Sequence, residues 1–512
     1  MSTEVELKLA ARPADLPELT RALVAMTPGA VRSQERLVST YYDTPDLALK
    51  QRGLILRVRE QGGRFIQAVK ADDPAGAGML SRGEWEDALR ENHPDPRAPQ
   101  SGPHLPQGVA DALRPLFVTD VSRTAIETEL LTGTGIEAAI DKGEVRLAAG
   151  DVGEPISEIE LELKSGDSSA LYDLALRLLE VAPIRIQMLT KSERGYRLVE
   201  GESATPAAVH AEPIELDPGM TVEAALQAIG RNCLAQLLRN EAAALAGEPE
   251  GVHQMRVALR RIRSAVSSLK ELLRAEDRRW LREELGWLAD ALGPARNLDV
   301  FATELLPSAR AGLPDKPGWE DLVATLGRLR KTAYDRVLGV ILSERYTAAM
   351  LRLLRWFETC GWRIYTPPGE ADPLASSIIQ IAPRVLDRRL RRVRRGSEEF
   401  DRLSSPQRHK LRIATKKLRY TVEIFNSLFD PDILPQFIKS LKRLQDDLGY
   451  ANDIRVAHEF VPELFAQMEA RSRAIHAWMD VLQWHDQILA RRERTLRKHL
   501  HRLNHATPFW RG

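Results

Sequence analysis

Two segments within the first 200 residues alternate charged and apolar side chains, and this pattern restricts the possible folds more than any other feature. The first segment is Glu4–Lys8 and the second is Glu158–Lys164. A period of two is the period of a β-strand, so charged side chains point to one face and apolar side chains to the other. We therefore predict two strands whose charged faces carry Glu4, Glu6, Lys8, Glu158, Glu160 and Glu162.

Basic residues alternate in the same way between these two segments. Arg57 and Arg59 flank Val58 in a run that also reads as a strand. A single strand of this kind usually turns its charged face to solvent. Carboxylates and basic groups that face one interior would instead form a site for a divalent cation together with a polyanion. Burial of so many charges of both signs is unfavourable without such ligands.

The 512-residue chain changes its character near residue 200, which divides it into two domains. Residues 1–200 are predicted to be α+β, with about eight strands, enough to close an antiparallel barrel or tunnel, and with helices near 14–26 and 169–181. Residues 201–218 contain several prolines and read as a linker. Residues 219–505 carry Leu, Ala, Arg and Glu at helical spacing and are predicted to form an all-helical domain.

The helical domain contains an internal repeat. His253–Arg263 reads HQMRVALRRIR, and His409–Tyr420 reads HKLRIATKKLRY, at an offset of 156 residues. A Leu-Gly pair recurs at the same offset, at Leu292–Gly293 and Leu448–Gly449. Two helical bundles related by pseudo-symmetry are the simplest explanation.

Each copy of the repeat places basic side chains along one side of a helix. At about 100° per residue, the basic positions of each copy lie within about 80° of its histidine. The predicted stripes consist of His253, Arg256, Arg260, Arg263, His409, Arg412, Lys416 and Arg419. We expect no acidic i,i+4 partners of the kind that usually accompany a solvated basic face. Arginine binds phosphate oxygens bidentately, so an extended polyphosphate is the expected ligand. The two histidines either donate to phosphate or serve the structure.

A third basic block, Arg384–Arg395, is rich in arginine. It either covers a solvated helix exterior or widens the anion-binding surface. Nucleic acid is disfavoured as a partner, because no aromatic residues alternate with the basic stripes to stack on bases.

Other features of the sequence indicate the compartment. Cys233 and Cys360 are too few for a disulfide framework and lack the spacing of metal ligands, which indicates a reducing interior. The N-terminus lacks the basic-then-apolar layout of a signal peptide, and no apolar run is long enough to span a bilayer. We expect a cytoplasmic protein without a membrane partner. Association with polyphosphate granules and the oligomeric state remain open.

Residues 1–200 resemble the CYTH domain, a family of triphosphate tunnel metalloenzymes. The signature is E-x-E-x-K, and further matches keep their order and spacing over the whole segment. The matching residues are Glu4, Glu6, Lys8, Arg57, Arg59, Lys70, Arg82, Glu84, Glu86, Arg123, Asp141, Glu158, Glu160, Lys191 and Arg194. Residues 219–505 resemble the CHAD domain, a helical module similar to known polyphosphate binders. The combination resembles bacterial CYTH–CHAD proteins, for which inorganic triphosphatase activity is the best-supported assignment.

The resemblance implies an eight-stranded antiparallel tunnel that hydrolyses inorganic triphosphate to pyrophosphate and phosphate with Mg²⁺ or Mn²⁺. The implied metal ligands are Glu4, Glu6, Asp141, Glu158 and Glu160. Glu162 shares their face, and spacing alone does not decide which two of the three late glutamates bind metal. The implied catalytic residues are Glu4, Glu6, Lys8, Lys70 and Lys191. The implied substrate-binding residues are Arg57, Arg59, Arg82, Arg123 and Arg194.

Three other functions fit the same residues. An adenylate cyclase of the same superfamily would convert ATP to cyclic AMP, and an organic triphosphatase would act on thiamine triphosphate or nucleotides. A non-catalytic scaffold would bind polyphosphate without turnover. Hydrolysis needs no covalent nucleophile, because in phosphoryl transfer the protein mainly positions phosphates and stabilises charge.

Overall fold

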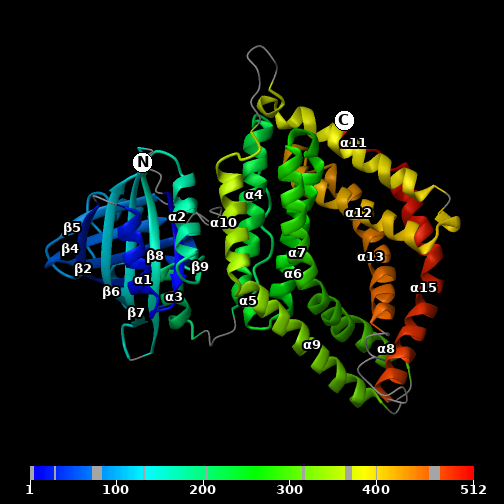
Figure 1. The fold of residues 1–512 in the computed structure, drawn as a ribbon, viewed down its shortest axis with the longest axis horizontal. Coiled ribbons are helices and arrows are strands. Elements are labelled where there is room, and N and C mark those ends of the chain that lie inside the picture. Colours follow the sequence, from blue (N-terminus) through cyan, green and yellow to red (C-terminus); the bar gives the residue numbers. More distant parts are fainter. Residues whose placement is uncertain are drawn as a thin grey trace. The chain divides into compact units, whose positions relative to one another are not determined.

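The computed structural model describes residues 5–27, 30–71, 83–130, 133–150, 152–201, 206–313, 318–363, 372–398, 400–460 and 473–511. The chain forms two compact units. The first unit is Met1–Ala207 with Leu342–Gly361, and the second is Ala208–Ile341 with Trp362–Gly512. Strands belong to the first unit and most helices to the second (Figure 1). A short helical segment from the C-terminal half of the sequence therefore belongs to the N-terminal unit.

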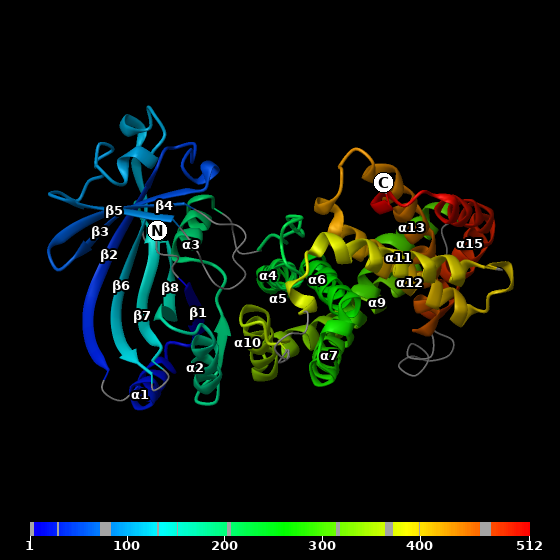
Figure 2. The ribbon, with the colours of Figure 1, turned by 90° about the horizontal axis from the view of Figure 1, so that it is seen from above.

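An antiparallel sheet of nine strands forms the first unit, in the order β5-β4-β3-β2-β6-β7-β8-β1-β9. The strands are β1 (Val5–Ala11), β2 (Val31–Asp43), β3 (Leu54–Gln61), β4 (Arg64–Ala71), β5 (Gly83–Leu89), β6 (Arg114–Glu129), β7 (Gly135–Leu147), β8 (Gly153–Ser165) and β9 (Ile184–Ile186). Figure 2 shows them side by side as a curved sheet. The edge strands β5 and β9 are not paired with each other among the described residues.

The sheet confirms the predicted antiparallel α+β domain, with one strand more than the eight expected. The additional strand, β9, has three residues and pairs with β1 through Leu9 and Ile186. Three residues are too few to show a period of two, so the sequence pattern does not reveal this strand.

Helix α3 (Lys191–Val199) begins at Lys191, which is a predicted site residue. A capping box begins the helix: Thr190 Oγ1 accepts from the Glu193 amide at 3.1 Å, and Glu193 Oε2 accepts from the Thr190 amide at 2.7 Å. Gly195 brings the helix close to β6, because a Cβ at this position would lie 2.1 Å from the Phe117 ring. The cap and the close packing together fix the position of Lys191.

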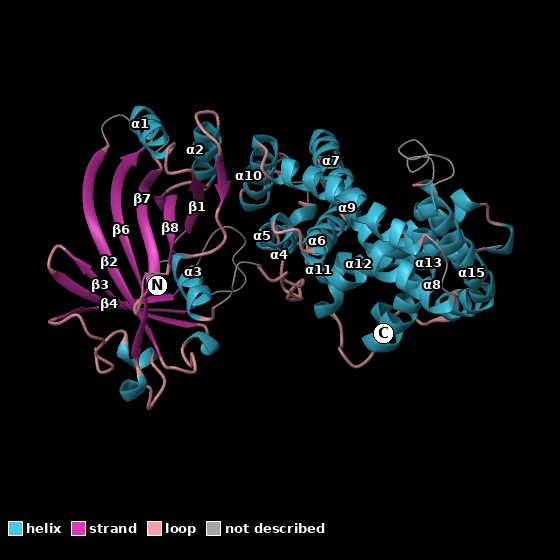
Figure 3. Cartoon of the chain, turned by 90° about the horizontal axis from the view of Figure 1, so that it is seen from below, coloured by secondary structure: helices cyan, strands magenta, loops and turns pink. Residues whose placement is uncertain are grey.

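Three other helices complete the first unit: α1 (Leu16–Met26), α2 (Ser169–Leu179) and α10 (Glu344–Glu358). Figure 3 shows α1 and α2 beside one end of the strands. Thr347 of α10 donates its hydroxyl to the Ile184 carbonyl of β9 at 3.1 Å. Arg355 of α10 lies 3.1 Å from Asp173 of α2. Hydrogen bonding and an ion pair thus tie α10 to this unit.

The second unit consists of helices, as the sequence pattern predicts. They are α4 (Val222–Arg239), α5 (Glu241–Leu245), α6 (Pro249–Ser268), α7 (Ala275–Val300), α8 (Leu306–Gly312), α9 (Trp319–Ile341), α11 (Ile378–Ser397), α12 (Ser405–Phe425), α13 (Leu434–Glu459) and α15 (Arg473–His505). Part of the expected linker packs on this unit, since Ile214 and Leu216 are buried and their backbone bonds to Ser427. Within the described residues, no helix combines the length and the hydropathy needed to cross a bilayer.

Candidate functional site

Charged side chains of both signs line a cavity of about 250 Å³ in the first unit, which we call the acid–base cavity. They project from strands across the sheet and from the start of α3. The charged lining residues are Glu6, Lys8, Arg57, Arg59, Lys70, Glu84, Glu86, Arg123, Asp141, Glu160, Glu162 and Lys191. The strand alternation therefore brings together most of the residues that the sequence singles out.

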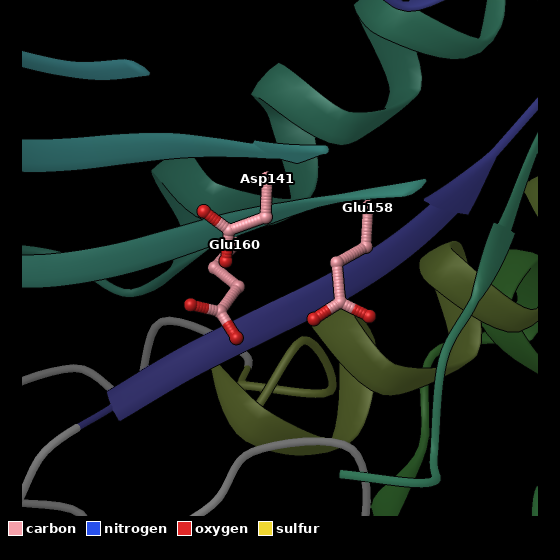
Figure 4. A group of neighbouring side chains, drawn as sticks. All are labelled: Asp141, Glu158 and Glu160. Carbon is pink, nitrogen blue, oxygen red and sulfur yellow. The ribbon is translucent and has the colours of Figure 1, made fainter. Parts of the chain in front are cut away.

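Three buried carboxylates at one side of this cavity could hold a metal ion. Asp141 of β7 and Glu158 and Glu160 of β8 each offer an oxygen atom, and these atoms all lie within 4.8 Å of one another. Figure 4 shows the three side chains gathered beside β1. Carboxylate oxygens are hard donors that suit Mg²⁺ or Mn²⁺, so the donor set fits such an ion.

Lysine and arginine side chains neutralise these carboxylates. Lys191 Nζ lies 2.7 Å from Asp141 and 2.9 Å from Glu160, and it also contacts Glu158. Arg123 donates to both oxygens of Asp141, at 2.8 and 2.6 Å, and to Glu160 at 2.5 Å. Lys8 lies 3.0 Å from Glu160. A divalent ion would share or replace these cationic contacts.

The electrostatic effect of these contacts outweighs burial. Burial opposes the charged form of Lys8, but the carboxylates of Glu160 and Glu6 raise the pKa of Lys8 above its ordinary value. Burial likewise opposes the charge of Glu160, yet Lys191, Lys8 and Arg123 hold the pKa of this carboxyl well below its ordinary value. Both side chains therefore stay charged near neutral pH.

The other side of the cavity is rich in arginine. Arg57 lies 3.0 Å from Glu84 and 3.7 Å from Glu86, and Lys70 lies 2.9 Å from Glu84. Arg59 differs, because no carboxylate of the described residues lies within ion-pair distance of it and its Nε donates to Ser39 Oγ at 3.4 Å. The nearby Arg57 charge and burial lower the pKa of Arg59 to about 10. Arg59 is thus a cation that an anionic ligand would stabilise.

Tyr41 is a lining residue that the charge pattern does not indicate. Burial raises the pKa of its phenol, but Arg57, Arg59, Lys191 and Lys70 together lower it below the ordinary value. The ring stacks on Phe117 with centroids 4.5 Å apart, within an apolar cluster that also contains Tyr196 of α3. The sequence offers one indication that Tyr41 lines the cavity. Tyr41 lies on the same strand as Ser39, on the side that faces Arg57 and Arg59.

Several predicted residues of this site are not found among the described lining residues of the cavity. Glu4 and Arg82 fall outside the described residues. Arg194 does not line the cavity and bonds instead to Glu154 at 3.4 Å and to the Pro155 carbonyl at 2.6 Å. Among the late glutamates, Glu160 and Glu162 line the cavity, whereas Glu158 lies behind them against Lys191.

A second charged cavity, of about 1100 Å³, lies in the helical unit, and we call it the basic groove. Both predicted basic stripes reach it from α6 and α12. Their lining members are His253, Arg256, Arg260, Arg263, His409, Arg412 and Lys416. Arg296, Arg455 and Arg492 also line it and were not predicted. Arg296 and Arg455 both follow the recurring Leu-Gly pairs, but at the 156-residue offset their counterparts are Asn452 and Asp299, so the repeat does not indicate them.

Several basic side chains of the basic groove have buried nitrogen atoms without partners. His253 Nδ1, Arg256 Nε, Arg260 Nε, His409 Nδ1 and Arg412 Nε are buried and make no hydrogen bond to the described residues. Burial, with Arg412 and Arg260, lowers the pKa of Lys416 to about 7. Burial, with Arg296, lowers the pKa of His253 to about 4, so this imidazole is neutral near pH 7. Buried polar atoms without partners are costly, and an anion in the groove would satisfy them.

One expectation for the helical unit, the absence of acidic i,i+4 partners, needs correction. Arg419 does not line the groove and pairs with Glu423, its i+4 neighbour, at 2.7 Å, so acidic partners are not absent from the stripes. None of the residues in the Arg384–Arg395 block lines the groove. Within that block, Arg388 pairs with Glu271, and Arg389 is buried against Ser267 and Ser268.

Comparison with known protein families assigns both units. The model of the CYTH domain matches residues 2–196, and the model of the CHAD domain matches residues 228–462. The chain therefore carries a CYTH domain followed by a CHAD domain.

Individual relatives agree with this assignment. Over 201 residues, the chain is 34% identical to the inorganic triphosphatase of Haemophilus influenzae, an alignment that covers 39% of this chain and 55% of that protein. The chain thus spans about half the length of this relative. It is also 27% identical over 426 residues to an uncharacterized protein of Mycobacterium tuberculosis, covering 76% of this chain and 75% of that protein. The crystal structure of the CHAD domain from the plant Ricinus communis is 27% identical, with a TM-score of 0.51, covering 59% of this chain and 98% of that chain.

Proposed function

We propose that the acid–base cavity hydrolyses inorganic triphosphate to pyrophosphate and phosphate in a metal-dependent reaction, and that the basic groove binds long-chain polyphosphate. The observation that carries the first part is the gathering of buried carboxylates and cations around one small cavity. The 34% identity with the inorganic triphosphatase of H. influenzae supports the choice of substrate. We further propose that the curved sheet closes as a tunnel around the substrate.

The cavity residues divide into two groups with different proposed roles. Glu6, Asp141, Glu158 and Glu160 would hold Mg²⁺ or Mn²⁺, together with Glu4. When bound, such an ion supplies charge neutralisation and an activated water. Lys8, Arg57, Arg59, Lys70, Arg123 and Lys191 would bind phosphate oxygens through charge-assisted hydrogen bonds. Arg82, which falls outside the described residues, and Arg194, which does not line the cavity, remain predicted substrate ligands.

The cationic residues would do most of the chemical work of this chain. They hold the triphosphate in line for attack on a terminal phosphorus, and they stabilise the charge that develops on the pyrophosphate leaving group. Burial opposes the charged form, but nearby carboxylates raise the pKa of Lys8 and of Lys191 above its ordinary value, so these two lysines act as fixed charges rather than as bases. Lys70 lies 2.9 Å from Glu84 and would add a further positive charge. A second role is to neutralise the carboxylates before substrate arrives.

The choice between the late glutamates can be tested directly. Glu160 both lines the cavity and belongs to the buried acidic cluster, so the test compares the other two glutamates. Glu158 contacts Lys191, and Glu162 lines the cavity. If Glu158 is a ligand, Glu158→Gln should raise the Mg²⁺ or Mn²⁺ concentration needed for half-maximal activity, and Glu162→Gln should not. The opposite result would assign the metal to Glu160 and Glu162.

The deciding experiment for the activity measures phosphate and pyrophosphate release. Tripolyphosphate, ATP and thiamine triphosphate are each incubated with the full chain and Mg²⁺ or Mn²⁺, with EDTA as the control. We expect metal-dependent cleavage that prefers tripolyphosphate and that disappears in Glu6→Gln. Glu144→Gln, at an exposed position of the same sheet, is the matched control and should remain active. Preference for ATP or thiamine triphosphate would favour the organic triphosphatase, and cyclic AMP formation the cyclase.

The groove proposal rests on the buried atoms that lack hydrogen-bond partners on both stripes. We propose that the two stripes come from two pseudo-symmetric bundles and bind one polyphosphate chain between them. Such binding would also direct the protein to polyphosphate granules. Absence of hydrolysis in a folded chain that still binds polyphosphate would favour the non-catalytic scaffold.

A further inference from the structure

We propose that the helical unit contains a second ligand site beside the basic groove, and that this site binds the organic body of a nucleotide-like phosphate ester. The site is a cavity of about 700 Å³ between α12, α13 and α15, which we call the side cavity. Its volume lies in the range of small-molecule sites. The inference rests on the proposed phosphate binding by the basic groove.

The interior of the side cavity is suited to an apolar body. Leu448 and Ile454 of α13, Leu496 of α15 and Phe400 line it and are buried. A bare polyphosphate would gain nothing from these side chains. A flat organic group would remove apolar surface from water in such a cavity.

The polar residues of the side cavity are largely paired with each other. Asp447 lies 2.6 Å from His499, Asp486 lies 3.1 Å from His458, and Glu493 lies 2.8 Å from Arg408. Such carboxylates repel phosphate but can accept hydrogen bonds from hydroxyl or amino groups. The side cavity thus suits the sugar and base of a nucleotide better than its phosphates.

The mouth of the side cavity is shared with the basic groove. His409, Arg412, Tyr450, Asn452, Arg455 and Arg492 line both. Arg412 Nε and His409 Nδ1 are buried there without hydrogen-bond partners. A ligand with its organic body in the side cavity would therefore extend its phosphates toward unsatisfied cations.

Tyr450 forms a fixed platform at this mouth. Its hydroxyl donates to His485 Nδ1 at 2.6 Å, and His485 Nε2 donates to the Leu305 carbonyl at 2.8 Å. The Arg492 guanidinium lies 4.5 Å from the ring centroid. Both the ring and the adjacent cation are held in place before a ligand binds, which lowers the entropic cost of binding.

The two repeat copies differ at one position, and this difference helps to explain why the side cavity is not filled by side chains. In the first copy, buried Asp299 of α7 ties this helix to α9, through Arg330 at 2.8 Å and Tyr334 at 2.7 Å. The residue at the 156-residue offset is Arg455, which bonds within α13 to Glu459 and Asn452. Among the described residues, Arg455 therefore makes no cross-helix link like that of Asp299, and it lines the side cavity instead.

The test compares ATP with tripolyphosphate by calorimetry on the full chain, in EDTA to prevent hydrolysis. Every protein in this comparison carries Arg57→Ala and Arg59→Ala, which remove two cations of the acid–base cavity and so weaken phosphate binding there. We expect ATP to bind about tenfold more tightly than tripolyphosphate, because only ATP has a body for the side cavity. Ala490→Trp, which adds bulk from an exposed lining position, should abolish this advantage. Ala324→Trp, at an exposed position of α9 outside the cavity, is the matched control and should preserve it.

Long-chain polyphosphate is measured in parallel, so that failure of the groove and failure of the side cavity are distinguishable. Polyphosphate binding within about twofold of the parent in Ala490→Trp, with the ATP advantage lost, supports the proposal. Equal binding of ATP and tripolyphosphate, unchanged by Ala490→Trp, overturns it. Photolabelling with azido-ATP followed by peptide mapping tests the site without an Ala490→Trp variant, so misfolding of that variant cannot affect the result. Label on peptides of α13 or α15 supports the site, and label confined to other peptides refutes it.

Discussion

Replacement of Lys191 by methionine should destabilise the CYTH unit strongly in the absence of metal. Lys191 Nζ is the shared partner of Asp141, Glu158 and Glu160, and its side chain is 14% exposed. Loss of one partner from a buried ion cluster leaves uncompensated charge, which costs about 3–5 kcal/mol. For a unit of this size, that corresponds to a decrease in Tm of roughly 6–20 °C. Calorimetric melting of the full chain in EDTA measures the effect.

Lys164→Met is the matched control. Lys164 also pairs with two carboxylates, Glu162 at 2.8 Å and Glu137 at 3.4 Å, but its side chain is 45% exposed. We expect it to cost about 1 kcal/mol or less. Equal melting of the two variants would refute the view that Lys191 balances a buried acidic cluster.

Metal and pH provide two further signatures of the Lys191→Met variant. Mg²⁺ or Mn²⁺ should restore much of the lost stability, because a divalent ion can neutralise the same oxygens. In the parent protein, the pKa of Glu160 lies well below 4.5, so its stabilisation is present above that pH and is lost as pH falls. In the variant, repulsion raises the carboxyl pKa values, so the difference from the parent should be smaller at pH 5 than at pH 8.

Three further outcomes are expected. Arg256→Ala with Arg412→Ala removes two cations of the basic groove and should weaken long-chain polyphosphate binding at least tenfold, while tripolyphosphate hydrolysis stays within about twofold. Loss of hydrolysis in a folded protein would contradict separate roles for the two units. Polyphosphate affinity, measured by titration at each pH, should fall as pH rises from about 7 to 9, because the pKa of Lys416 is about 7 and an anion favours its protonated form. Lys416→Met should flatten this pH dependence, and an unchanged pH dependence in the variant would exclude Lys416 as its cause. Residues 1–207 alone should melt at a lower temperature than the CYTH unit of the full chain, because they lack α10; Thr347→Val should reproduce part of that loss, about 1 kcal/mol, and equal melting would show that α10 contributes nothing.

The period-two pattern was sufficient to predict strands and six of the twelve charged residues that line the cavity, whereas Lys70, Glu84, Glu86, Arg123, Asp141 and Lys191 were assigned through the family resemblance. A strand alternates its side chains strictly, so Glu6, Lys8, Arg57 and Arg59 had to share the charged faces of their strands, and the structure brings those faces to one cavity. Lys191 was reached only through the family resemblance. Its position depends on the capping box at Thr190, which lies in a segment too short to show helical periodicity.

Other features depend on long-range packing that the sequence does not encode locally. The amphipathic pattern of α10 predicts a helix but not the unit against which it packs. Arg419 has the helical phase of its stripe, yet an available Glu423 one turn later provides a closer partner than the groove. The side cavity depends on the contrast between Asp299 and Arg455, which becomes visible only when the partners of Asp299 are known.

The two charged cavities address the same electrostatic problem in opposite ways. In the acid–base cavity, every carboxylate of the Asp141, Glu158 and Glu160 cluster contacts a lysine or arginine, so an incoming anion must compete with existing ion pairs. A triphosphate that arrives with a divalent cation brings both charges needed to replace those pairs. In the basic groove, the buried Nε atoms of Arg256, Arg260 and Arg412 make no hydrogen bond to the described residues, and the pKa of Lys416 is lowered, so a bare anion would be stabilising there by itself. This difference in charge arrangement is the basis of our proposal that metal-complexed short chains are turned over in the first unit and uncomplexed long chains are retained in the second.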